Sequence, residues 1–191
     1  MKKLALSLTA AVGAITFSGA AEAQQRAILV VDTDRILNEC TACKAAATQL
    51  QSQVQQGRTR AQQLETSLKT EADALEKAGQ ALGGKQPDAA LQARIAAFRT
   101  KQQQAQTELG NRQSTIESTQ ANVQRQIGTR IVQIVEQSRA RRQASVVVTK
   151  SSALASDPAI DITGEVLTAL NQQLPSVSVT PLPQQPRPQG R

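Results

Sequence analysis

The chain has 191 residues and is basic, with 22 Lys and Arg against 15 Asp and Glu and a net charge of +7. It contains no His, Trp or Tyr and 2 Phe, which excludes histidine chemistry and a conventional aromatic-rich core. With 2 Cys and no His, one subunit cannot supply the four ligands of a structural zinc site.

The first 23 residues have the pattern of a secretory signal. Lys2 and Lys3 supply a positive start, residues 4–17 form an apolar stretch, and Ala21-Glu22-Ala23 is a small-x-small cleavage site. The apolar stretch is shorter than the roughly 20 residues of a membrane-spanning helix. We therefore expect residues 1–23 to be removed as a signal peptide and the mature protein to be soluble and located in the periplasm.

A short β-type segment comes next. Residues 27–31 form an apolar, partly β-branched run, which is typical of a strand buried on both faces. Asp32 and Thr33 follow it, and they either cap a helix or form a polar turn at the end of the strand.

Residues 44–143 have the composition of two long helices with one interruption near residues 79–88, where Gly79, Gly83, Gly84 and Pro87 occur. In each half, one set of positions recurs alternately every four and three residues. The first set is Leu50, Val54, Gly57, Ala61, Leu64, Leu68, Glu71, Leu75, Ala78 and Leu82, and the second is Leu91, Ile95, Phe98, Gln102, Ala105, Leu109, Arg112, Ile116, Thr119 and Val123. Two such seams joined by a turn predict an antiparallel helical hairpin.

The pattern also predicts how the two helices align. Folding the chain about Gly84 places Leu68 beside Ala105, Gly57 beside Ile116, and Leu50 near Val123. Many seam positions carry small or polar side chains where a stable coiled coil has Leu, Ile or Val. We therefore expect a weakly held arm that flexes.

Positive charge is concentrated on this arm. Residues 44–142 carry 15 basic and 8 acidic residues, a net charge of +7, while the rest of the chain after residue 23 has a net charge of −1. The simpler interpretation is that these charges keep a long helix in solution. The functional interpretation is attraction of an anionic partner. Export and the lack of aromatic stacking residues exclude nucleic acid, so acidic protein segments or anionic lipid headgroups remain.

After the arm, residues 144–149 predict a returning strand, and residues 152–156 predict a second short strand after a turn. Asp161 is expected to cap a short helix whose apolar face is Val166, Leu167 and Leu170. We expect residues 24–43 and 144–174 to form one discontinuous β-containing body, with residues 175–191 as a Pro-rich disordered tail outside the core.

Cys40 and Cys43 have a spacing that occurs in redox enzymes, metal sites and haem attachment. The βαβ context, the further metal ligands and the adjacent His that these sites need are all missing. The alternatives are a local disulfide at the start of the first helix or paired thiols without a role. The Ser and Thr residues also lack a His partner, so no catalytic residue, metal or cofactor is predicted and an enzyme is not expected.

The sequence resembles the Skp (OmpH) family of periplasmic chaperones. The residues that carry the resemblance are 28–32, 35–39, 44–46, 146–148, 157–163 and 165–167, with the hairpin between them. The resemblance implies a mainly α fold with a small β body. Three copies would form a jellyfish-like homotrimer whose tentacle-like hairpins surround a cavity for unfolded outer-membrane proteins. A trimer would also supply the core that so small a β body lacks.

The expected function is therefore that of an ATP-independent holdase, which prevents aggregation of unfolded outer-membrane proteins during transit. The alternative is a structural or adaptor coiled-coil protein that binds a folded envelope partner or an anionic membrane surface, including lipopolysaccharide. Candidate client-binding residues lie in the tip half of the arm and are Lys69, Lys77, Leu82, Lys85, Arg94, Phe98, Arg99 and Lys101. Phe98 also fits the seam between the helices, which is the more favoured role for it.

Overall fold

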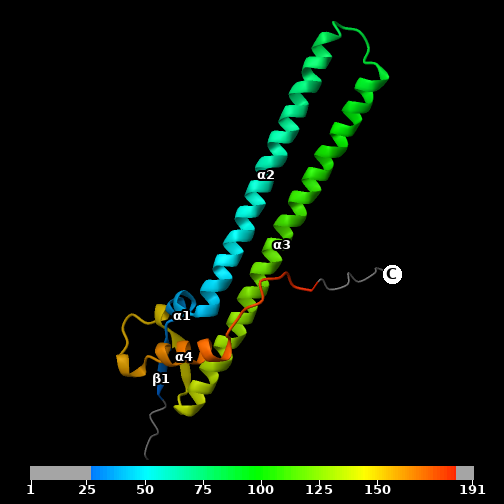
Figure 1. Cartoon of the computed structure of the whole chain (residues 1–191). Coiled ribbons are helices and arrows are strands. Elements are labelled where there is room, and N and C mark those ends of the chain that lie inside the picture. The colour runs from blue at the N-terminus through cyan, green and yellow to red at the C-terminus, as the bar shows by residue number, and fades with distance from the viewer. Residues whose placement is uncertain (1–26, 184–191) are drawn as a thin grey trace, which may run out of the picture.

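The computed structural model describes residues 27–183, so the predicted signal peptide lies outside the described residues. The elements in chain order are β1 (Ile28–Val31), α1 (Thr33–Glu39), α2 (Thr41–Ala81), α3 (Ala89–Arg141), β2 (Val146–Thr149), two 3-10 turns (Lys150–Ser152 and Pro158–Ile160) and α4 (Thr163–Gln173). Helices α2 and α3 form a long arm that projects from a small body built from the other elements (Figure 1). Among residues 27–183, no helix is both long and apolar enough to span a membrane.

The length of the arm follows from its helices. Helix α2 has 41 residues and α3 has 53, which at about 1.5 Å per residue gives roughly 60 and 80 Å. The predicted antiparallel hairpin is confirmed, since α3 returns along α2 to the body (Figure 1).

The body contains a parallel pair of strands. Strands β1 and β2 pair in register from Ile28 beside Val146 to Val31 beside Thr149, and the whole hairpin forms the crossover between them. The other edge of β1 is occupied by residues near the start of α4, because the Ile162 N–H donates to the Val30 carbonyl at 2.9 Å.

The predicted second strand over residues 152–156 is wrong. The chain forms a 3-10 turn at Lys150–Ser152 and then continues without regular structure, and the Leu154 side chain lies fully in solvent. The segment around Asp161, rather than residues 152–156, extends the sheet, because it bridges to Val30 at the other edge of β1.

The segment after β1 is a helix rather than a polar turn. Asp32 caps α1, and its side chain accepts a hydrogen bond from the Arg35 N–H at 2.9 Å. Helix α1 ends at Glu39, and the non-helical backbone of Cys40 (ψ of 127°) separates it from α2. Cys40 and Cys43 are joined by a disulfide with a Cα to Cα distance of 5.1 Å, and both are buried. The break in the helix allows a disulfide at such close spacing.

The hydrophobic core lies in the body and at the lower end of α3. Its α3 members are Val123, Ile127, Ile131 and Ile134. They pack with residues of β1, α1 and α4, including Leu29, Val31, Ile36, Ile162, Val166 and Leu170. The predicted cap at Asp161 is wrong by one position, because Ile162 is the N-cap of α4 and makes no side-chain capping hydrogen bond. Asp161, one residue earlier, still accepts a hydrogen bond from the Thr163 N–H at 2.8 Å, which satisfies one free donor of the helix. The predicted apolar face of α4 thus covers the core.

The arm has a much thinner seam. On α2 every predicted seam position is partly buried. On α3 above the body, the buried seam positions are Leu91, Ala105 and Thr119. Gln102 and Arg112, also seam positions, are exposed because their long polar side chains reach water. The predicted alignment is confirmed at Gly57, where an added Cβ would lie 3.5 Å from the Cδ1 atom of Ile116.

At the tip, the turn between the helices uses two glycines with positive φ, Gly83 at 55° and Gly84 at 91°. Asp88 then caps α3 by accepting a hydrogen bond from the Leu91 N–H at 2.8 Å. The predicted break is thus built from residues that favour turns and helix starts.

The beginning of the Pro-rich tail differs from the prediction. Residues 175–183 leave α4 and run along α3 towards the middle of the arm (Figure 1). Val177 and Val179 pack against the core, so this part of the tail contributes to it. Hydrogen bonds from helix side chains to the tail backbone hold it there. Residues 184–191 lie outside the described part of the chain.

Candidate functional site

The candidate cations of the arm fall into two groups. Lys69 forms an ion pair with Asp73 at 3.0 Å, and Lys101 forms one with Glu71 at 2.8 Å. The other four are exposed and form no ion pair within residues 27–183, and these are Lys77, Lys85, Arg94 and Arg99. They lie within about two to three helical turns of the tip loop. Asp88 is the one carboxylate between residues 77 and 99, so the end of the arm carries a net positive charge.

The two apolar candidates have different environments. Phe98 is partly buried and lines a hollow between the helices together with Leu68 and Ala105, so its ring contributes to the seam. Leu82 is partly exposed at the end of α2. Leu82 therefore lies at the tip of the arm, whereas Phe98 contributes to the seam.

An ion-pair network fixes the middle of the arm. Arg60 on α2 donates two hydrogen bonds to Glu108 on α3, at 2.8 and 2.9 Å, and Arg112 donates a third at 3.1 Å. The hydrogen bonds from Arg60 and then from Arg112 lower the pKa of Glu108 from 4.5 to about 2. Because the two helices are joined here by a bidentate pair, a shift in their alignment would break it.

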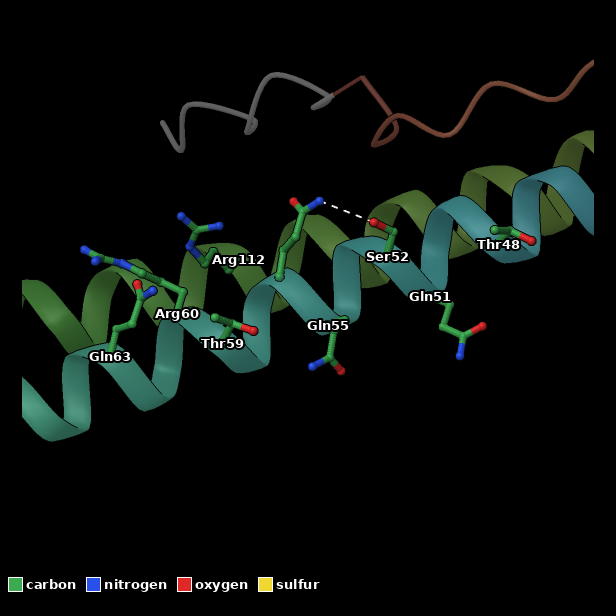
Figure 2. Close-up of a pocket in the computed structure, with 9 residues that line it drawn as sticks. Thr48, Gln51, Ser52, Gln55, Thr59, Arg60, Gln63 and Arg112 are labelled. Carbon is green, nitrogen blue, oxygen red and sulfur yellow. Dashed lines mark hydrogen bonds between the residues drawn. The ribbon is translucent and has the colours of Figure 1, made fainter.

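Next to this network the surface of the hairpin is hollowed and polar. Figure 2 shows the side chains that line the hollow, which come mainly from α2 with Arg112 from α3. They are Thr48, Gln51, Ser52, Gln55, Gln56, Thr59, Arg60, Gln63 and Arg112. Amide and hydroxyl groups of this kind bind polar backbone groups without demanding a particular sequence.

The part of the chain between residues 27 and 183 contains no cluster of three or more His, Cys, Asp or Glu side chains suited to a metal ion. Cys40 and Cys43, the strongest candidates in the sequence, are bonded to each other.

The groove in which the tail lies is not predicted from the sequence. The groove is formed by Ser118, Asn122 and Gln126, one turn apart on α3, with Gln53 of α2 beside them. Two patterns in the sequence could have indicated this contact between the tail and α3. Polar residues recur every four positions on α3, and Ser176 to Thr180 alternate polar and apolar side chains as a strand does.

The body carries exposed apolar side chains around its strands. Ile28 and Val146, a pair at one end of the sheet, are 52% and 42% exposed, and Val132 on α3 is 68% exposed. A sheet of two strands with apolar residues in water is incomplete as an isolated unit.

An ion-pair cluster joins the ends of α3 and α4. Glu165 at the start of α4 accepts hydrogen bonds from Arg141 and Arg142. The Ser138 hydroxyl, then these two guanidinium groups, lower the pKa of Glu165 from 4.5 to about 2.

These features define a class of protein: a long, weakly packed helical hairpin with a cationic tip on a small body whose apolar surface is not fully covered. The chain belongs to the OmpH-like family, because the family model described as Outer membrane protein (OmpH-like) matches residues 27–170.

Solved structures include the same fold. A protein of Caulobacter crescentus CB15, described as a candidate outer membrane chaperone (OmpH-like), superimposes with a TM-score of 0.67 at 21% sequence identity. The match covers 82% of this chain and 90% of that chain. No curated protein matches the chain. At this level of identity the likeness shows a shared fold.

Proposed function

We propose that the protein is an ATP-independent periplasmic holdase that binds unfolded outer-membrane proteins between basic helical arms and prevents their aggregation. The observation that carries the proposal is the arm itself, which combines uncompensated cations at the tip with a seam that has few fully buried residues. Membership of the OmpH-like family and the description of the Caulobacter relative agree with it.

The tip cations support capture of a client by long-range attraction. Lys77, Lys85, Arg94 and Arg99 extend into solvent, where attraction to acidic segments acts over about 10 Å at moderate salt. Leu82 offers an apolar contact beside them. Lys69 and Lys101 join this surface when a client competes for their intramolecular carboxylates. The same charges suit anionic lipid or lipopolysaccharide as a second kind of partner.

The surface of the body supports assembly into a homotrimer. Ile28, Val132 and Val146 leave apolar area in water that copies of the chain would cover. Three arms around one axis would enclose a space in which a client is shielded from other unfolded chains.

The experiment that tests the holdase proposal uses an unfolded outer-membrane barrel diluted from urea, with light scattering as the readout. At a modest molar excess the protein should suppress scattering, and added salt should weaken the suppression because it screens the tip charges. A variant with Lys77, Lys85, Arg94 and Arg99 all changed to Gln should suppress less than a control with Lys44 and Arg58, in the half of α2 nearer the body, changed to Gln. Full scattering in the presence of the protein would leave the adaptor as the better account.

A further inference from the structure

The tail segment formed by residues 177–182 lies in a groove that binds it through its backbone. Gln126 donates to the Ser178 carbonyl at 3.0 Å and accepts from the Ser178 N–H at 3.1 Å. Asn122 donates to the Thr180 carbonyl at 3.0 Å, and the Leu182 N–H donates to the Ser118 hydroxyl at 3.0 Å.

These hydrogen bonds form at regular intervals because the repeat of the extended tail is close to the repeat of helix α3. Alternate residues of an extended chain are about 6.6 Å apart, and residues four apart on an α-helix are about 6 Å apart. Successive contacts of the tail therefore fall on successive turns of α3 as the tail runs antiparallel to that helix. The side-chain amide of Gln126 pairs with Ser178 through both a donor and an acceptor, as a neighbouring β-strand would.

The hydrogen bonds contain little sequence information. Within the described residues, every hydrogen bond between the tail and helices α2 and α3 uses a backbone N–H or C=O of the tail. One of them joins the Gln53 side chain to the Val179 carbonyl at 3.2 Å. The apolar contribution comes from Val177 and Val179, which alternate with polar neighbours. Alternating apolar and polar residues are also the pattern of the strands of a membrane β-barrel.

We propose that this groove is a binding site for an extended segment of an unfolded client and that the tail of the protein occupies it as an intramolecular competitor. The inference rests on the proposed holdase function and assigns one site to it. The polar surface continues from the groove towards the tip, because Gln53 also lines a hollow with Gln56, Asn111 and Thr115. In Figure 2 Gln51 and Gln55 point away from the tail.

The test releases the tail without changing the groove. In a Val177→Asp/Val179→Asp variant of the full chain the tail loses its apolar contacts, while a Pro175→Asp/Ser176→Asp control adds the same charge at exposed positions before the docked stretch. If the tail fills the groove about 80% of the time, its release raises the apparent affinity for a labelled unfolded barrel about fivefold. The control should bind as the unchanged protein does. A Ser178→Pro variant, which removes the N–H bound by Gln126, tests the same release without added charge.

Two further measurements make the outcome specific. A labelled peptide with the sequence of residues 175–183 should bind the released variant, should bind the unchanged protein more weakly, and should lose binding when Asn122→Ala and Gln126→Ala are added. Addition of client to the unchanged protein should speed hydrogen exchange at the Ser178 and Leu182 amides, which the groove protects.

The inference would be overturned if release of the tail left the client affinity unchanged and if added client did not change hydrogen exchange at the Ser178 and Leu182 amides. The tail would then only stabilise the fold. Failure of the holdase proposal is distinguishable, because then neither the unchanged nor the released protein would prevent aggregation, whatever the peptide does.

Discussion

Replacement of Gly57 by Ala should stabilise the arm. Gly57 lies inside α2 at a seam position, where glycine is less favourable than alanine by about 1 kcal/mol because of its backbone freedom in the unfolded chain. The new Cβ would meet the Cδ1 atom of Ile116 at 3.5 Å, an ordinary van der Waals distance. A few new contacts of about 0.1–0.2 kcal/mol each bring the expected gain to about 1–1.5 kcal/mol.

Hydrogen exchange of the α2 and α3 amides is the assay, because local opening of the arm need not follow unfolding of the body. The gain should slow exchange around residues 57 and 116 by about 5- to 13-fold, since 1.4 kcal/mol corresponds to a factor of ten. Gly110→Ala is the matched control, because a Cβ there meets nothing within 4 Å and the helix preference acts alone. Faster exchange in Gly57→Ala than in the unchanged protein would refute the alignment of the two helices.

Three further predictions concern the arm and the body. Glu108→Gln should loosen the middle of the arm, because Arg60 and Arg112 lose a shared carboxylate, and a spin-label distance between α2 and α3 should broaden there; an unchanged distribution would contradict this. Ile134→Ala, in the core at 1% exposure, should lower the free energy of unfolding by about 2–5 kcal/mol, whereas Leu75→Ala in the partly exposed seam should lower it less, as urea titration would show. Glu165 has a folded-state pKa of about 2, below its ordinary 4.5, so its stabilisation is present above pH 4.5 and is lost as the pH falls towards 2. Glu165→Gln should therefore be less stable at neutral pH and should lose less stability on acidification; identical pH profiles of the two proteins would contradict the assignment.

The sequence predicted the hairpin well because the signals that define it are local and repeated. Apolar residues spaced by three and four located both helices and aligned Gly57 with Ile116. At Asp32 the sequence left a helix cap and a polar turn open, and the structure has the cap. Two exposed seam positions, Gln102 and Arg112, show that position in a heptad does not force a long polar side chain into the interface.

The body was harder to predict, because its pairings join residues that are far apart in the chain. The edge of β1 is filled by residues around Asp161, more than a hundred positions away, and nothing local to β1 indicates this pairing. The proline content of the tail predicts disorder, although its Val177 and Val179 carry an alternating pattern that fits a groove built by α2 and α3. The groove residues Asn122 and Gln126 are ordinary polar side chains of a helix. Their spacing indicates a binding site only when the extended segment that they bind is known.

The central claim is that copies of this chain together enclose an unfolded client. The most direct measurement is the molar mass of the particle formed when an unfolded outer-membrane barrel is diluted into the protein, obtained by light scattering during size exclusion. The account predicts a soluble complex of three copies of the chain and one client, and a trimer without client. A stable monomer that elutes alone while the client aggregates would contradict it.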